Sequence, residues 1–391
     1  IKPKMELEIL FELAVIMVSA AVLGTLFLFL RQPIVIAYIA IGFALGPGGL
    51  GLIKETTHLE QIAHVGVILL LFLIGLNLQP QKLLAIFQKT ALLTLSTSLL
   101  FALAATTFAL LLQFSLFASL IVGAAMMFSS TVVGLKLVPT TTLHHKRTGE
   151  VMTGVLLLQD LLAILIILLL SGGGSEHPIM AFGLLLLKFI ALAIALFLGV
   201  RWIMLPLLTR FDVVQEYTFV ATLGWCLLGA EVAHLVGLSY EIGAFTAGIS
   251  IASSPVALAI AEHLKPLREF FLILFFFAIG ARLNLQISPL LLAAAIIFGT
   301  LLVPLKAFIF RKAFVWSGEK ESASKELSVR LSQASEFSLL VVLAATSGDW
   351  LHYEQGMMIQ IATLITFIFS TYWTVLRYPT PISASRHLLQ D

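Results

Sequence analysis

The feature that most constrains this chain is the recurrence of long apolar runs along almost its whole length. A helix that crosses a bilayer needs about 20 largely apolar residues, and thirteen such runs occur here. Only 11% of the residues are charged, whereas soluble domains carry about 25%. The sequence therefore predicts an all-α polytopic membrane protein with about thirteen transmembrane helices.

The predicted spans differ in length and regularity. The second is short and rich in glycine, and the fifth and twelfth are interrupted by polar residues. The thirteen ranges are 8–30, 33–50, 61–78, 91–112, 115–138, 148–170, 179–208, 213–236, 239–257, 264–281, 288–312, 327–347 and 355–377.

The distribution of lysine and arginine predicts how these spans are oriented. With the N-terminus outside, sixteen such residues fall in the inside loops and C-terminal tail, and four fall outside. Positively charged loop residues favour the cytoplasmic side of a membrane. We therefore expect a multi-pass protein of the cell's inner (plasma) membrane, with the N-terminus outside and the C-terminus in the cytoplasm. A partner among nucleic acids is not expected.

Two pairs of segments resemble each other at a nearly constant separation. AYIAIGFALG (37–46) resembles SYEIGAFTAG (239–248), and LFLIGLNLQ (71–79) resembles FFAIGARLNLQ (276–286). The matching glycines lie 202 residues apart in the first pair and 205 apart in the second. The matching spans are seven apart, an odd number, so the two copies face opposite ways. Such inverted repeats are typical of secondary transporters, with the binding site near the midplane.

The repeat predicts a domain organisation. Residues 1–377 are expected to form one transmembrane antiporter domain, with inverted repeats over about 8–170 and 213–377 and a linker helix over about 179–208. The polar segment 378–391 contains two prolines and is expected to be a cytoplasmic tail that links to a regulatory domain.

Small polar residues occupy the middle of two spans at positions related by the same offset. Ser129, Ser130 and Thr131 lie in the fifth span, and SQASEFS (332–338) lies in the twelfth. These residues favour two crossed, discontinuous helices, whose unwound backbone is tolerated at membrane depth only where protein buries it or water reaches it. The alternative is an unbroken helix in which the hydroxyls bond to carbonyls of the preceding turn.

A carboxylate lies near the centre of the sixth span. VLLLQDLLAILIILLL (155–170) is apolar except for Gln159 and Asp160, and an aspartate at that depth costs about 2.5–3.5 kcal/mol on insertion scales. Asp160 must therefore face an aqueous cavity or a cation, unless it belongs to a structural ion pair. A carboxylate that holds one proton or one monovalent cation, and faces each side in turn, is an exchange site. Gln159 adds a neutral oxygen, although it points to another side of the helix.

Two further charged residues lie at membrane depth. Lys306 follows Pro304 in the eleventh span. It either pairs with Asp160, or neutralises the negative ends of the broken helices, or snorkels to the cytoplasmic surface. Glu336 falls at the expected interruption of the twelfth span and is expected to pair with Lys306 or to line the path of the ion.

Several of these segments together resemble the Kef-type potassium:proton antiporters, in the second branch of the monovalent cation:proton antiporter superfamily. The segments that carry the resemblance are FSSTVVGLK (128–136), LLLQDLLAI (156–164), LFFFAIGARLNL (274–285), VPLKAFIF (303–310) and SQASEFSLLV (332–341). The resemblance implies a sodium/proton-antiporter-like fold and a homodimer in the lipid bilayer. It also implies a cytosolic nucleotide-binding regulatory domain or subunit.

The resemblance also implies roles for single residues. Asp160 would bind the ion and the proton, with Lys306 as the supporting lysine and Ser129, Ser130 and Thr131 at the first crossing. The Gln–Asp pair, in place of two adjacent acids, indicates K⁺ and electroneutral exchange. Some members have an acidic loop before the tenth span through which glutathione acts. The corresponding segment 253–267 contains one acid, Glu262, so glutathione gating is not expected.

The function expected from the sequence is secondary active K⁺/H⁺ antiport, without enzyme activity and without a cofactor in this chain. A nucleotide is expected only on the cytosolic domain. The first alternative is a Na⁺/H⁺ antiporter of the same fold. The second is a channel-like, gated K⁺ efflux system, against which the lack of a TVGYG-like filter counts.

Overall fold

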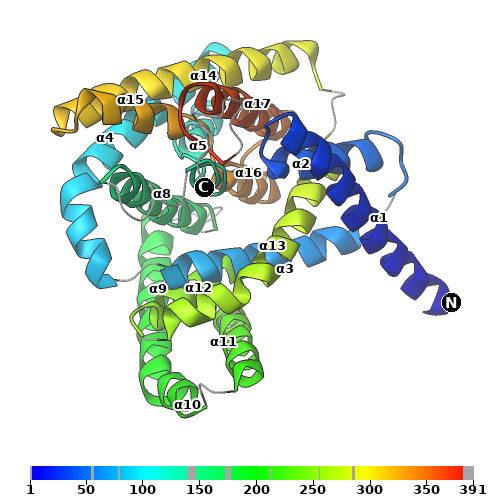
Figure 1. The fold of residues 1–391 in the computed structure, drawn as a ribbon, viewed down its shortest axis with the longest axis vertical. Coiled ribbons are helices and arrows are strands. Elements are labelled where there is room, and N and C mark those ends of the chain that lie inside the picture. The colour runs from blue at the N-terminus through cyan, green and yellow to red at the C-terminus, as the bar shows by residue number, and fades with distance from the viewer. Residues whose placement is uncertain are drawn as a thin grey trace. The chain divides into compact units, whose positions relative to one another are not determined.

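A computed structural model describes residues 2–53, 57–77, 80–138, 147–171, 178–211, 214–254, 256–283 and 287–381. This part of the chain is almost entirely helical (Figure 1). The helices are α1 (Lys2–Phe29), α2 (Ile34–Leu45), α3 (Thr57–Asn77), α4 (Pro80–Leu111), α5 (Leu116–Met126), α6 (Thr131–Lys136), α8 (Arg147–Ser171), α9 (Pro178–Gly199), the π-helical turn η1 (Val200–Met204), α10 (Leu205–Arg210), α11 (Gln215–Leu235), α12 (Tyr240–Ala252), α13 (Ala257–Arg282), α14 (Pro289–Trp316), α15 (Glu321–Arg330), α16 (Glu336–Ser347) and α17 (Tyr353–Arg377).

The prediction of a polytopic helical membrane protein is confirmed. Each of the thirteen predicted spans overlaps a described helix. Within the described ranges, eight helical stretches are long and apolar enough to cross a membrane. Shorter apolar helices occur at Ile34–Leu45, Gln61–Leu76 and Glu336–Ser347.

One predicted loop is a helix. The segment 253–267 was expected to precede the tenth span as a loop, yet α13 begins at Ala257 and continues through Pro266. Ala257, Ile260 and Leu264 are buried at helical spacing, so this part of α13 has an apolar face to pack. Glu262 therefore lies on a helix, and the expectation of a loop here is wrong.

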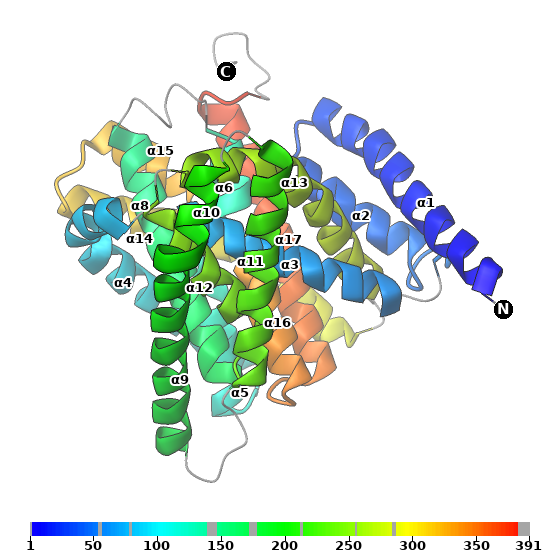
Figure 2. The same ribbon diagram turned by 90° about the horizontal axis from the view of Figure 1, so that it is seen from below.

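The chain divides into two compact units, which are described separately. Unit 1 contains residues 1–44, 86–167 and 283–391, and unit 2 contains residues 45–85 and 168–282. In unit 1, α14 packs against α15 and α17, and α16 packs against α5 and α17 (Figure 1). In unit 2, α3 lies along α12 and α13, and α9 and α11 pack against α12 (Figure 2).

Unit 2 is held together by a close approach of two helices at glycines. A Cβ atom added at Gly248 in α12 would overlap the backbone oxygen of Phe72 in α3, and one added at Gly75 in α3 would overlap the backbone oxygen of Phe245. Small residues at such contacts let membrane helices pack backbone to backbone, which maximises van der Waals contact.

Unit 1 contains the two broken helices that the sequence predicted. Helix α5 ends at Met126 and α6 begins at Thr131, whereas α15 ends at Arg330 and α16 begins at Glu336. We call residues 127–130 the first interruption and residues 331–335 the second interruption. The two helices that follow them begin 205 residues apart.

The helix before the second interruption differs from the predicted span at 327–347. It begins earlier, at Glu321, and its sequence ESASKELSVR is polar. Ser324, Leu327 and Ser328 on this helix are buried. The first half of the helix carries the exposed charges Glu321 and Lys325, so its start has no apolar run and hydropathy alone misplaced it.

Candidate functional site

The two interruptions lie against each other in unit 1. The Ser129 hydroxyl donates a hydrogen bond of 2.7 Å to the Leu331 carbonyl. The Gln333 side-chain amide donates one of 3.3 Å to the Ser130 carbonyl. The Leu331 carbonyl at the end of α15 is therefore bonded across the crossing, as backbone at membrane depth requires. The Ser130 carbonyl, which already accepts from the Gly134 N–H within α6, takes a second bond there.

Asp160 lies beside the start of α6. Its side chain comes from α8 and is 1% exposed. The Thr131 hydroxyl lies 3.2 Å from Oδ1 and 3.1 Å from Oδ2 of Asp160, and donates to the carboxylate. A carboxylate has about four acceptor positions, and the described part of the chain provides no cation within ion-pair distance of Asp160. Its oxygens therefore retain capacity for a proton or a metal cation.

Lys306 is fully buried in α14 and holds the two interruptions together. Its Nζ donates a hydrogen bond of 2.6 Å to the Phe128 carbonyl and one of 2.9 Å to the Gln333 carbonyl. The ammonium also lies 4.9 Å from the centre of the Phe101 ring. Three alternatives were open for Lys306. The structure shows the one in which the ammonium bonds carbonyls at the ends of the broken helices. Neither snorkelling nor pairing with Asp160 is observed.

Glu336 is the first residue of α16 and is 1% exposed. Its Oε1 accepts a hydrogen bond of 3.1 Å from the backbone N–H of Val132, and its Oε2 accepts one of 3.5 Å from the Ser335 hydroxyl. Glu336 thus bonds to α6 and not to Lys306, contrary to one expectation. Asp160 and Glu336 therefore contact adjacent residues, Thr131 and Val132, in the first turn of α6.

Gln159 supports the first interruption and does not face the Asp160 carboxylate. Its side-chain oxygen accepts a hydrogen bond of 2.9 Å from the Ser129 N–H. Its amide nitrogen donates to the Ser98 hydroxyl at 3.2 Å and to the Met127 carbonyl at 3.4 Å. Both functional atoms of Gln159 are thus occupied by the protein, which makes it a support for the backbone of the site.

Ser129 and Ser130 also act on the backbone. The Ser130 hydroxyl accepts a hydrogen bond of 2.9 Å from the Val133 N–H and so caps the start of α6. Of the residues predicted to bind the ion, the structure places Asp160 and Thr131 in direct contact. The other three position the peptide groups around them.

A row of buried hydroxyls on α17 was not predicted from the sequence. Thr366 accepts a hydrogen bond of 2.9 Å from the Ala334 N–H, and Ser370 donates one of 3.0 Å to the Gln333 side chain. Both hydroxyls hold the second interruption in place. The detectable signal is the helical spacing of small polar residues through an apolar span, at Thr363, Thr366, Ser370 and Thr374.

The burial of Arg330 was not predicted from the sequence. Arg330 is one of the sixteen basic residues expected on the inside, and it is 2% exposed at the end of α15. The side chain turns into the protein because three oxygens there accept its hydrogen bonds. The sequence does not distinguish a basic residue that faces water from one that bonds carbonyls at a helix end.

Comparison with known proteins gives one family. The family model described as "Sodium/hydrogen exchanger, transmembrane" matches residues 16–376. Among curated proteins, K(+) efflux antiporter 5 of Arabidopsis thaliana is 31% identical over 91% of this chain and 63% of its own length. K(+) efflux antiporter 6 of the same plant is 29% identical over 91% of this chain and 60% of its own length. The chain thus spans about three fifths of the length of these plant relatives.

Two further similarities are more distant. The iron transporter MagA of Paramagnetospirillum magneticum is 26% identical over 92% of this chain and 83% of its own length. The structure of a sodium proton antiporter from Methanocaldococcus jannaschii is similar with a TM-score of 0.68, at 14% identity, over 93% of this chain and 96% of that one. The structural match shows that the two proteins share a fold.

Proposed function

Because this chain belongs to the sodium/hydrogen exchanger transmembrane family, we propose that it is a secondary active antiporter that exchanges K⁺ for H⁺ through Asp160. The observation that carries the proposal is a buried carboxylate that accepts hydrogen bonds from one side-chain hydroxyl, that of Thr131, and has no cation beside it among the described residues. An uncompensated carboxylate at this depth is costly unless an ion accompanies it.

The exchange follows from the charge of the site. Asp160 with a bound proton, or with one bound K⁺, is neutral and can move through a low-dielectric environment. Without either ion it is charged, and that state is the most costly to bury. Lys306 does not compete for the carboxylate because its donors are directed to the Phe128 and Gln333 carbonyls. One ion therefore replaces the other, and the cycle is electroneutral provided that Glu336 keeps its charge state.

K⁺ is the proposed cation on two grounds. The plant relatives bear the name K(+) efflux antiporter, and the residue next to Asp160 is the neutral Gln159. The Thr131 hydroxyl beside Asp160 supplies a further oxygen, the ligand type that hard cations such as K⁺ and Na⁺ share.

The architecture of the crossing supports an inverted repeat. The residue pairs Ser129–Leu331, Ser130–Gln333 and Val132–Glu336 are hydrogen-bonded and separated by 202, 203 and 204 residues. The two glycine-containing sequence pairs have nearly the same separation. We propose that residues 8–170 and 213–377 are the two copies and that 179–208 links them.

We further propose a homodimer in the cell's inner membrane, with the N-terminus outside and the C-terminus in the cytoplasm. The loop charges support this orientation. A cytosolic regulatory domain or subunit, able to bind a nucleotide, would act through the segment after α17. Residues 382–391 of that segment lie outside the described residues.

The test is cation-resolved exchange in proteoliposomes. A preformed pH gradient should collapse on addition of K⁺ but not of choline, with a smaller response to Na⁺, and the rate should not depend on an imposed membrane potential. Asp160→Asn should abolish the K⁺ response while the protein still inserts. Glu241→Gln is a matched control, because it removes another carboxylate from a membrane helix, one that bonds to His64 in unit 2.

Three outcomes decide between the functions. K⁺-coupled proton flux that persists in Asp160→Asn would contradict the site. A response to Na⁺ that exceeds the response to K⁺ would favour the sodium exchanger. Large single-channel currents in planar bilayers would favour the gated channel.

A further inference from the structure

Arg330 is a buried arginine that nothing in the exchange cycle uses. It is the last residue of α15, and its side chain is 1% exposed. A guanidinium has five donors and remains charged at any physiological pH. Burying it is costly unless those donors find acceptors, so its partners show what the residue holds together.

The guanidinium bonds to two other segments of unit 1 and to its own helix, α15. Nη1 donates a hydrogen bond of 2.7 Å to the Leu137 carbonyl, directly after α6. Nη2 donates one of 2.7 Å to the Pro379 carbonyl, beyond the end of α17. Nε donates one of 3.0 Å to Glu326, one turn earlier in α15. The rigid planar group fixes the mutual geometry of all three.

Helix α6 connects Arg330 to the proposed ion site. It has six residues, so it is about 9 Å long and too short to be stable by itself. Its position depends on its ends and its packing. Thr131 at one end contacts Asp160, and Leu137 at the other end contacts Arg330. A displacement of Leu137 therefore moves Thr131 relative to the carboxylate.

The segment 378–381 is held by the same guanidinium. Besides the bond to Pro379, the ring centre of Tyr378 lies 5.9 Å from Cζ of Arg330. Thr380 is fully buried, so this segment packs against the protein directly after α17 and does not leave it at once. The end of the described chain and the end of α6 thus share one side chain.

We propose that Arg330 is a positioning residue that couples the segment 378–381 to the ion site through α6. A cation bound at Asp160 shifts the equilibrium position of this segment, and a pull on the segment changes cation affinity. Both effects reflect the same coupling free energy, because coupling between sites is reciprocal. The inference rests on the proposed function only in requiring that K⁺ binds at Asp160.

A spin label on the tail tests the coupling. The single cysteine, Cys226, is buried and would be replaced by alanine, and a nitroxide would be attached at Pro381→Cys, an exposed position. Label mobility would be measured in nanodiscs in K⁺ and in choline at equal ionic strength. We expect K⁺ to change the mobility, and the change to disappear in Arg330→Gln and in Asp160→Asn.

Transport gives a second readout that a merely structural role would not move. In proteoliposomes, Arg330→Gln should raise the KM for K⁺ at least about fivefold, with a smaller change in the maximal rate per inserted protein. Arg311→Gln is the matched control. It removes an arginine that pairs with Glu321 on α15 and is 46% exposed, and it should leave both readouts unchanged.

The outcomes separate this inference from the proposed function. If wild type exchanges K⁺ but its label does not respond to K⁺, the coupling is wrong and the exchange stands. The coupling is also wrong if the response persists in Arg330→Gln. A response that persists in Asp160→Asn would show that K⁺ acts on the tail from another site and would overturn the coupling, whereas proton flux in that variant decides the exchange. Should Arg330→Gln fail to insert, Arg330→Lys should also lose the response, because its donors all lie on one nitrogen and cannot reach acceptors placed around three guanidinium nitrogens. A retained response in Arg330→Lys would overturn the proposal.

Discussion

Units 1 and 2 fill their interiors in opposite ways. In unit 1, two helices are interrupted, and Lys306, Glu336 and Arg330 are buried among backbone carbonyls and N–H groups. In unit 2, α3 and α12 are unbroken at their crossing and meet at Gly75 and Gly248. Among the described residues, charged side chains bond the interrupted backbone of unit 1, whereas the helices α3 and α12 bond their own peptide groups where they cross.

This difference shows how a polar site can exist at membrane depth. A continuous helix bonds its own peptide groups, so its neighbours need only fit its shape. A broken helix exposes carbonyls and N–H groups that other residues must bond, and the side chains recruited for this create a polar interior. Asp160 lies in that interior with one hydroxyl partner, Thr131. The following predictions test whether the two units depend on shape and on charge as this comparison requires.

The largest effect on folding is expected in unit 2. Gly248→Ala places a Cβ against the backbone oxygen of Phe72, so α3 and α12 must separate, at a cost of about 3 kcal/mol. Gly224→Ala is the control, since a Cβ there meets nothing within 4 Å, and alanine in a helix gains about 1 kcal/mol over glycine. Thermal unfolding in detergent measures both. Equal melting temperatures for the two variants would contradict close packing at Gly248.

The next effect concerns charge in unit 1. Lys306→Met keeps the volume of the side chain but leaves the Phe128 and Gln333 carbonyls without their shared donor. We expect a loss of about 2 kcal/mol in unfolding free energy, together with a lower exchange rate per inserted protein. Lys312→Met, at an exposed position of the same helix, is the control. If both variants behave like wild type, Lys306 does not hold the interruptions.

The sequence predicted those elements of unit 1 that have a local signature. Apolar length located the spans, and small polar residues at Ser129–Thr131 and in 332–338 located both interruptions. The partners of Lys306 could not be predicted, because the choice among Asp160, carbonyls and the membrane surface depends on the rotation of α14 about its axis. Long-range packing decides that rotation, and hydropathy does not record it.

The contacts that could not be predicted from the sequence mostly join residues far apart in the chain. Gln159 and Asp160 are neighbours in sequence, but one holds Ser129 and the other Thr131 because they point to different sides of α8. Arg330 bonds to Leu137, 193 residues away. No single-sequence pattern reports a pairing at that distance.

A smaller effect is expected from the second carboxylate at the crossing. Glu336→Gln keeps an oxygen that can accept from the Val132 N–H but removes a negative charge from the interior that binds a cation. The KM for K⁺ should rise by less than about tenfold, which corresponds to about 1.4 kcal/mol, with little change in melting temperature. Exchange assays over a K⁺ series measure this. A variant with unchanged KM would show that Glu336 only anchors α6.

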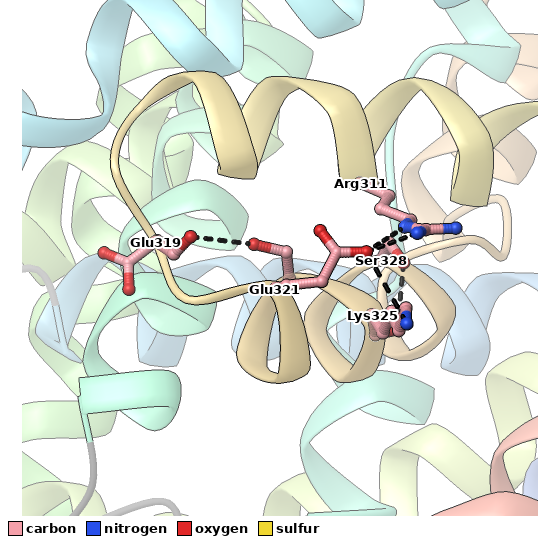
Figure 3. A network of polar contacts seen from close by, with 6 residues as sticks. Arg311, Glu319, Glu321, Lys325 and Ser328 are labelled. Atoms are coloured by element: carbon pink, nitrogen blue, oxygen red, sulfur yellow. Dashed lines mark hydrogen bonds and ion pairs between the residues drawn. The ribbon is translucent and has the colours of Figure 1, made fainter.

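The smallest effect is expected where charges in unit 1 are exposed. Glu321 bonds to Arg311 and lies near Lys325, so α14 and α15 are linked at the surface (Figure 3). The hydrogen bond from Arg311 lowers the pKa of Glu321. A carboxyl group whose pKa is lowered in the folded state stabilises the fold at pH values above its ordinary pKa of about 4.3. This stabilisation is lost as the pH falls through the lowered pKa. Water screens an exposed pair, so Glu321→Gln should lower the melting temperature only slightly at pH 7. The difference should vanish in 1 M salt, where the screening length is about 3 Å. A loss of stability as large as that of Lys306→Met would contradict the comparison, because exposed charges in unit 1 would then stabilise the fold as much as buried ones.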